Sequence, residues 1–174
     1  MVLLSQRASA THDDGCVLCA KSGWPIPREN PEEYTNVDAA TLSFKNAHLT
    51  ERFVTRLGVQ IRSQASVDYN CVGMVFASRR FWIEDEHIKT ILDEDSYRRI
   101  AREQVVLGDV AIYAFRGERV HVGVVVEILQ ELGRRTSRFK VMSKWGLLPE
   151  FIHFEGAVPE QFEKVSEFYT DRLL

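Results

Sequence analysis

The chain has few of the residues that mark specialised classes of protein. Its 174 residues include only three cysteines and five prolines, too few for a disulfide scaffold or a proline-rich extended chain. Lysine and arginine number 22 against 25 aspartate and glutamate residues, so the formal net charge is -3. Because such a chain has no overall positive field to attract phosphates, we expect no nucleic-acid partner.

Long hydrophobic runs are also missing from the sequence. No stretch reaches the roughly 18 consecutive apolar residues that a membrane span needs, and the opening residues MVLLSQR do not resemble a secretory signal. We therefore expect a cytoplasmic protein without a membrane partner. In that compartment thiols are normally reduced, so the cysteines are expected to be free thiols or a metal-binding pair.

The overall composition is that of a globular protein. Hydrophobic residues make up 45% of the chain and charged residues 27%, and the length suits one domain with its own core. We expect a single domain over residues 1–174. Three prolines between residues 25 and 31 disfavour regular structure, which suggests that residues 1–49 form a loop-rich wrap around a core of residues 50–174.

Periodicity and capping signals predict helices in the first half of the core and strands in the second. The chain order of helices followed by an antiparallel meander indicates the α+β class. The predicted helices are a short one at 50–58, a buried one at 70–80, one or two surface helices within 84–103, and a helical segment at 159–168. The predicted strands form a hairpin from 109–115 and 120–128, followed by a third strand at 138–143.

A cysteine and a histidine stand where they can form a nucleophilic pair. Cys71 follows Asn70, a good N-cap, so its sulfur should lie over the free amides of a helix N-terminus, which lower a thiol pKa. His121 lies early in a predicted strand between two valines, so a helix packed on the sheet can meet its imidazole. The alternative is that both residues are ordinary core residues, because free cysteine is among the most buried residue types.

Three sequence blocks around these residues resemble the NlpC-type, papain-like cysteine peptidases. YNCVGMV (residues 69–75) resembles their Asp-Cys-Ser-Gly-Leu-Val segment, LGDVAIY (107–113) their Pro-Gly-Asp-Leu-Val-Phe-Phe strand, and VHVGVV (120–125) their His-Val-Gly-Ile-Tyr strand. The blocks occur in the family's order. The resemblance implies a papain-like α+β fold in which Cys71 is the nucleophile and His121 the general base of a hydrolase acting on amide, peptide or isopeptide bonds.

The chain also departs from this family. Asn70 replaces the usual aspartate and Val72 the usual serine. Typical members are exported to cut peptidoglycan, so a chain without an export signal implies a different peptide or amide-containing substrate. The competing interpretation is a catalytically inactive binding or structural module with the same fold.

The family also implies a third polar residue that orients the imidazole. Ser143 is the first choice by strand position and His153 is its rival, whereas a cation at Lys144 would oppose an imidazolium and Glu150 lies further along. Trp145 either lines the substrate cleft or caps the core.

The remaining assignments concern substrate, metal and cofactor. The candidate substrate-binding residues are Tyr69 and Asn70, which directly precede Cys71, and Trp145. Cys16 and Cys19 have the spacing of half a zinc site, but a complete site needs a second pair at similar spacing, which the sequence lacks. We therefore expect no metal and no cofactor, with zinc at this cysteine pair as the weak alternative.

Overall fold

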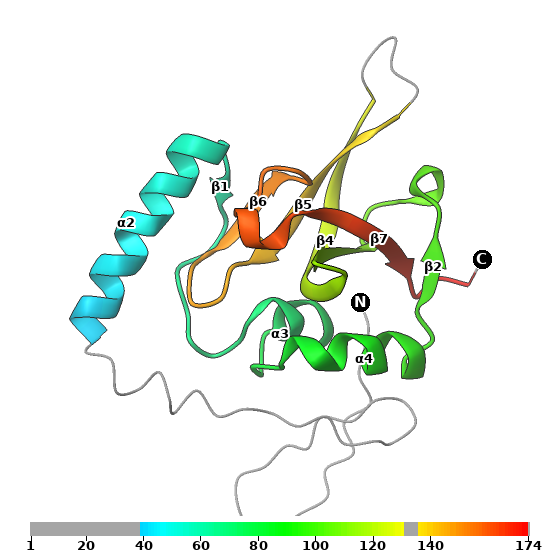
Figure 1. Cartoon of the computed structure of the whole chain (residues 1–174), viewed down its shortest axis with the longest axis horizontal. Coiled ribbons are helices and arrows are strands. Elements are labelled where there is room, and N and C mark those ends of the chain that lie inside the picture. The colour runs from blue at the N-terminus through cyan, green and yellow to red at the C-terminus, as the bar shows by residue number, and fades with distance from the viewer. Residues whose placement is uncertain (1–38, 131–135, 174) are drawn as a thin grey trace, which may run out of the picture.

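The computed structural model describes residues 39–130 and 136–173, and within them helices pack on one large sheet (Figure 1). The α-helices are α2 (Ala39–Leu57), α3 (Cys71–Phe76) and α4 (Ile88–Glu94), and short 3-10 helices are η1 (Asp85–His87), η2 (Arg102–Gln104) and η3 (Glu160–Phe162). The strands are β1 (Gln60–Ile61), β2 (Arg98–Ile100), β3 (Val110–Phe115), β4 (Glu118–Leu129), β5 (Arg138–Lys144), β6 (Glu150–Phe154) and β7 (Lys164–Thr170). This content confirms the α+β class.

The seven strands form one antiparallel sheet in the order β1-β6-β5-β4-β3-β7-β2. Strands β3 to β5 form the meander that the sequence predicts, and β6, which was not predicted, continues it. The β3–β4 hairpin turns at Arg116 and Gly117, which both have positive φ (52° and 89°), as a tight turn between twisted strands requires. The strands at both edges of the sheet are short, which limits the backbone that is open to pairing with another chain.

Two hydrophobic clusters lie on opposite faces of this sheet. One joins α3 and α4 to residues such as Ile112 and Val122, and the other contains Tyr113, Trp145 and most of the buried aromatic rings. Ile112 of the first cluster and Tyr113 of the second are consecutive residues of β3, so their side chains point to opposite faces of the sheet. Helices α3 and α4 cover the first face, as Figure 1 shows below the sheet, and α2 adds Phe53 to the second cluster.

Two predictions from the sequence are wrong, one near residue 39 and one near residue 160. Helix α2 begins at Ala39, so residues 39–49 are helical and do not belong to a loop-rich wrap. The helix ends at Leu57, and Gly58 (φ +63°) follows it as the predicted terminating glycine. The predicted helical segment 159–168 is instead η3 followed by strand β7. Strand β7 pairs with β3 and β2, and these backbone pairings outweigh a weak local helical pattern.

Two helices predicted in the middle of the chain are shorter in the structure. Helix α3 stops at Phe76, because Ser78 and Arg79 take positive φ, so the predicted helix 70–80 is too long. Within 84–103, α4 confirms one helix, but residues 98–100 form β2 against β7. Among the described residues, no helix combines the length and the apolar character needed to cross a membrane.

Candidate functional site

Cys71 is the first residue of α3, and Asn70 caps that helix. The Asn70 Oδ1 accepts from the amides of Gly73 (3.0 Å) and Ile83 (3.3 Å), while its Nδ2 donates to the Ile83 carbonyl (2.6 Å). An aspartate has no hydrogen to donate to that carbonyl. The asparagine therefore serves as helix cap and as the link between α3 and the segment at Ile83.

The Cys71 thiol is buried, with 5% of the residue exposed. Backbone amides of Cys71, Val72 and Val122 lie within hydrogen-bonding reach of the sulfur and favour its thiolate. Burial opposes them, and together with the nearby Asp85 carboxylate it raises the pKa of the thiol to about 12. The thiol is therefore protonated at neutral pH in this arrangement.

His121 lies on β4 opposite Tyr113, on the face of the sheet that carries the aromatic cluster. Its ring stacks on Phe162 of η3, with the centroids 4.1 Å apart and the planes inclined by 8°. Burial and the neighbouring His153 hold the pKa of His121 well below its usual value, so the imidazole is neutral. Among the described residues no group hydrogen-bonds its Nε2 atom.

The structure therefore does not join the two predicted partners by a hydrogen bond. Cys71 packs in the cluster that contains Val122, and the side chain of His121 points to the other face of the same strand. The two groups are nevertheless linked through the backbone, because the amide that reaches the Cys71 sulfur belongs to Val122, the residue directly after His121.

Ser143 and His153, the two candidates for the residue that orients His121, hydrogen-bond each other. The Ser143 Oγ lies 2.8 Å from His153 Nε2 and accepts from Trp145 Nε1 at 2.9 Å. His153 Nδ1 lies 2.8 Å from the carbonyl of Phe154, which can only accept, so Nδ1 carries the proton and Nε2 accepts from the Ser143 hydroxyl. Burial lowers the pKa of His153 to about 4.

The three predicted substrate-binding residues are engaged inside the protein. Trp145 is buried and contacts Phe53 and Phe151, so it packs in the core. The Tyr69 hydroxyl donates to Glu150 (2.8 Å), and Asn70 bonds backbone groups as described above. Their roles toward a substrate remain predictions.

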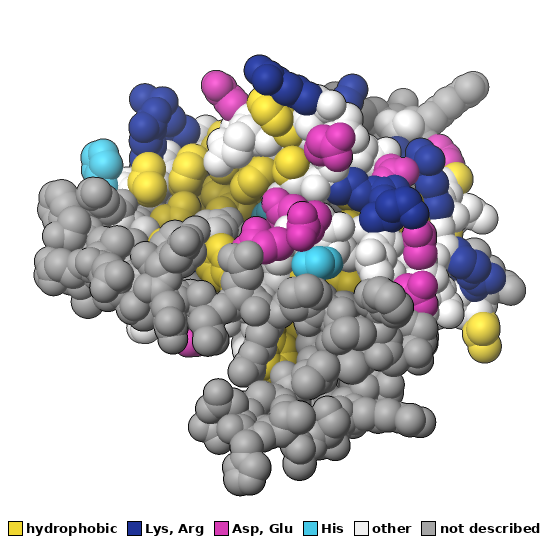
Figure 2. All heavy atoms as spheres, turned by 60° about the horizontal axis from the view of Figure 1, so that its bottom comes forward, with side chains coloured by type: hydrophobic (Ala, Val, Ile, Leu, Met, Phe, Trp, Pro, Cys, Tyr) yellow, Lys and Arg dark blue, Asp and Glu magenta, His cyan; other side chains and the backbone are white. Residues whose placement is uncertain are grey.

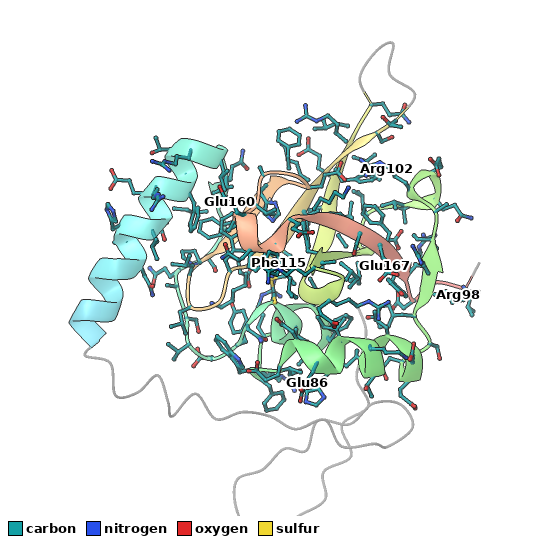
Figure 3. All side chains as sticks on the ribbon, in the orientation of Figure 1. Glu86, Arg98, Arg102, Phe115, Glu160 and Glu167 are labelled. Atoms are coloured by element: carbon teal, nitrogen blue, oxygen red, sulfur yellow. The ribbon has the colours of Figure 1, made fainter. Side chains whose placement is uncertain are left out.

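A pocket of about 600 Å³ lies beside this site, between η1, the β3–β4 turn and β7. Its walls carry both signs of charge, and Figure 2 shows acidic side chains next to basic ones on this face. Glu86 and Glu167, labelled in Figure 3, lie on different walls. Asp85 lines the pocket too, and burial with the nearby Glu84 raises its pKa to about 7. Cys71 is not among the lining residues.

Sequence reasoning missed the carboxyl group of Asp85, and it considered Lys144 and Glu150 without predicting that they are buried and paired. The acidic run at residues 84–86 is the only local sign of Asp85, and nothing local shows that it faces the thiol. Within the described parts of the chain, no three His, Cys, Asp or Glu side chains gather as a metal site. The candidate zinc ligands Cys16 and Cys19 lie outside the described residues.

No protein-family model, curated protein or solved structure matches the chain.

Proposed function

We propose that the protein is a papain-like, NlpC-type cysteine hydrolase that cleaves an amide, peptide or isopeptide bond with Cys71 as nucleophile and His121 as base. The observation that carries the proposal is the position of the Cys71 sulfur at the start of α3, facing three backbone amides. One of these amides follows His121 directly on β4. The proposal also places the enzyme in the cytosol, where its thiol stays reduced.

In the reaction, the Cys71 thiolate attacks the substrate carbonyl carbon and forms a carbon–sulfur bond. The carbon–nitrogen bond then breaks, and the imidazolium of His121 gives its proton to the leaving amine. In the second step His121 removes a proton from water, whose oxygen attacks the thioester and releases the acid and the free thiol. An amine in place of water makes the same enzyme an acyltransferase. The amides at the start of α3 and at Val122 suit stabilisation of the oxyanion.

The protonated thiol and the neutral imidazole describe the enzyme without substrate. Proton transfer requires the His121 nitrogen and the Cys71 sulfur to come within hydrogen-bonding distance, and such contacts often form only in the substrate complex. Because the two side chains lie on opposite faces of β4, this contact requires β4 or α3 to rearrange when the substrate binds, and no hydrogen bond among the described residues holds the His121 Nε2 atom in place.

The second candidate function is an inactive module that keeps the fold and binds a partner. Two observations favour it: burial raises the pKa of the Cys71 thiol to about 12, and no hydrogen bond joins the thiol to His121. In this alternative, Cys71 is a core residue and the imidazole of His121 only packs against aromatic rings.

A directed alkylation experiment separates the two candidates. The protein is prepared with Cys16→Ser and Cys19→Ser, so that Cys71 is its only cysteine, and is treated with a set of short peptides that carry a chloroacetamide. The hydrolase predicts that at least one peptide labels Cys71 rapidly at neutral pH, and that His121→Ala slows this labelling about 100-fold, the lower range of base catalysis. Equal, slow labelling in both proteins would refute the hydrolase and favour the module.

A further inference from the structure

Two adjacent sheet residues carry charges that are completely buried. Lys144 ends β5 and Glu150 begins β6, the two residues are paired in register, and both are 0% exposed. Removing a charge from water is costly unless several polar groups surround it. The hydrogen-bond partners of these two residues therefore indicate which parts of the chain the buried charges hold together.

Lys144 connects the sheet to the segment that precedes Cys71. Its Nζ donates to the carbonyls of Ser66 (2.8 Å), Gly146 (2.7 Å) and Leu148 (2.8 Å). The last two carbonyls belong to the β5–β6 connection, so only the bond to Ser66 reaches another part of the chain. Asp68 shapes that part, because its carboxylate accepts from the Ser66 hydroxyl (2.6 Å).

Glu150 connects the sheet to residues on both sides of Cys71. Its carboxylate accepts from Tyr69 Oη (2.8 Å), from Arg62 Nη1 (2.8 Å) and from Arg79 Nε (2.5 Å). Tyr69 and Arg62 precede α3, and Arg79 follows it. The charged donors hold the pKa of Glu150 below its usual value, against the effect of burial, so the carboxylate is ionised.

We infer that Lys144 and Glu150 are positioning residues that hold the Cys71 thiol in its shielded position, because together they tie both flanks of α3 to the sheet. The inference rests on the proposed function in so far as Cys71 is the reactive group. A pair that served only the stability of the sheet would bond within the sheet. Here the attachments to Ser66, Tyr69 and Arg79 all converge on the short segment that carries the thiol.

The test measures how fast iodoacetamide, a small reagent without affinity for the site, alkylates Cys71 in the background that lacks Cys16 and Cys19. Lys144→Met is expected to accelerate alkylation about tenfold or more, because a hydrogen bond to a charged group contributes at least that factor to a local opening equilibrium. Tyr69→Phe removes one donor from the ionised Glu150, which keeps its donors Arg62 and Arg79, and is expected to accelerate alkylation by a smaller factor of about three. In both variants the alkylation pKa should fall from about 12 toward the ordinary thiol value.

Two controls distinguish local positioning from general loss of stability. Lys140→Met alters the same strand four positions earlier, where the lysine pairs with the half-exposed Glu127, and should leave the rate unchanged. Val158→Ala removes buried apolar atoms from the cluster on the other face of the sheet and provides a destabilised reference.

The inference is overturned if the Lys144 and Tyr69 variants react at the parent rate, or no faster than Val158→Ala at an equal loss of melting temperature. If Lys144→Met does not fold, Tyr69→Phe decides alone by the same comparison. Iodoacetamide reactivity needs no turnover, so this result is separate from the peptide labelling that tests the hydrolase.

Discussion

Mild acid should destabilise this protein because two neutral histidines are buried in its aromatic cluster. His153 is the better defined of the two, since its Nε2 accepts from Ser143 while its Nδ1 donates to the Phe154 carbonyl. A proton added at Nε2 occupies the lone pair that accepts from the Ser143 hydroxyl, so the hydroxyl hydrogen loses its acceptor. Burial adds the cost of placing a positive charge among aromatic rings.

The size of the effect follows from the two pKa values of His153. The folded protein has a pKa of about 4, below the ordinary value of 6.5, so the unfolded chain takes up the proton first as the pH falls. Stability is therefore intact above pH 6.5 and is lost as the pH falls from 6.5 toward 4. Between pH 7 and pH 5 the loss from this one group is about 2 kcal/mol by linkage. His121 acts in the same direction.

The assay is urea unfolding of the parent and of His153→Gln at a series of pH values between 7 and 5. Glutamine removes the titrating group, so the difference in unfolding free energy between the two proteins should shift in favour of the variant by about 2 kcal/mol over this range. His48→Gln, on the exposed surface of α2, is the matched control and should follow the parent. A difference between parent and His153→Gln that does not change with pH would refute the assignment of a buried neutral imidazole.

Three further substitutions test the elements around Cys71 and the sheet. Asn70→Ala should lower the unfolding free energy by about 2 kcal/mol or more in urea titrations, because it removes a helix cap and the donor to a buried carbonyl; an unchanged value would contradict the cap. Gly73→Ala should prevent folding or displace α3, because the added Cβ would lie 1.7 Å from the backbone oxygen of Phe81. The loss would be seen in the near-ultraviolet circular dichroism spectrum. Gly156→Ala, which has open space around its Cβ, is the control and should melt at the temperature of the parent. Asp109→Ala should cost about 2 kcal/mol, since this buried carboxylate accepts from the Arg172 guanidinium and from a backbone amide, and a melting temperature equal to the parent's would contradict that role.

The local features of the fold were accessible from the sequence because they depend on neighbouring residues. The hairpin follows from two β-branched segments on either side of a turn with glycine, and the start of α3 follows from a capping asparagine. The segment 159–168 was misassigned for the opposite reason. Its strand exists because β3 offers an open edge to it, and that edge belongs to residues about 50 positions earlier.

The sequence by itself determined the α+β class, the helix that begins at Cys71 and the strand that carries His121. Only the tertiary structure decided that the imidazole points to the aromatic face, that Ser143 bonds His153, and that buried charges tie the thiol segment to the sheet. Caps, turns and alternation are set by residues a few positions apart. The face toward which a strand residue points, and the partner that a buried charge finds, depend on how distant segments pack, and one sequence without that packing carries no direct record of either.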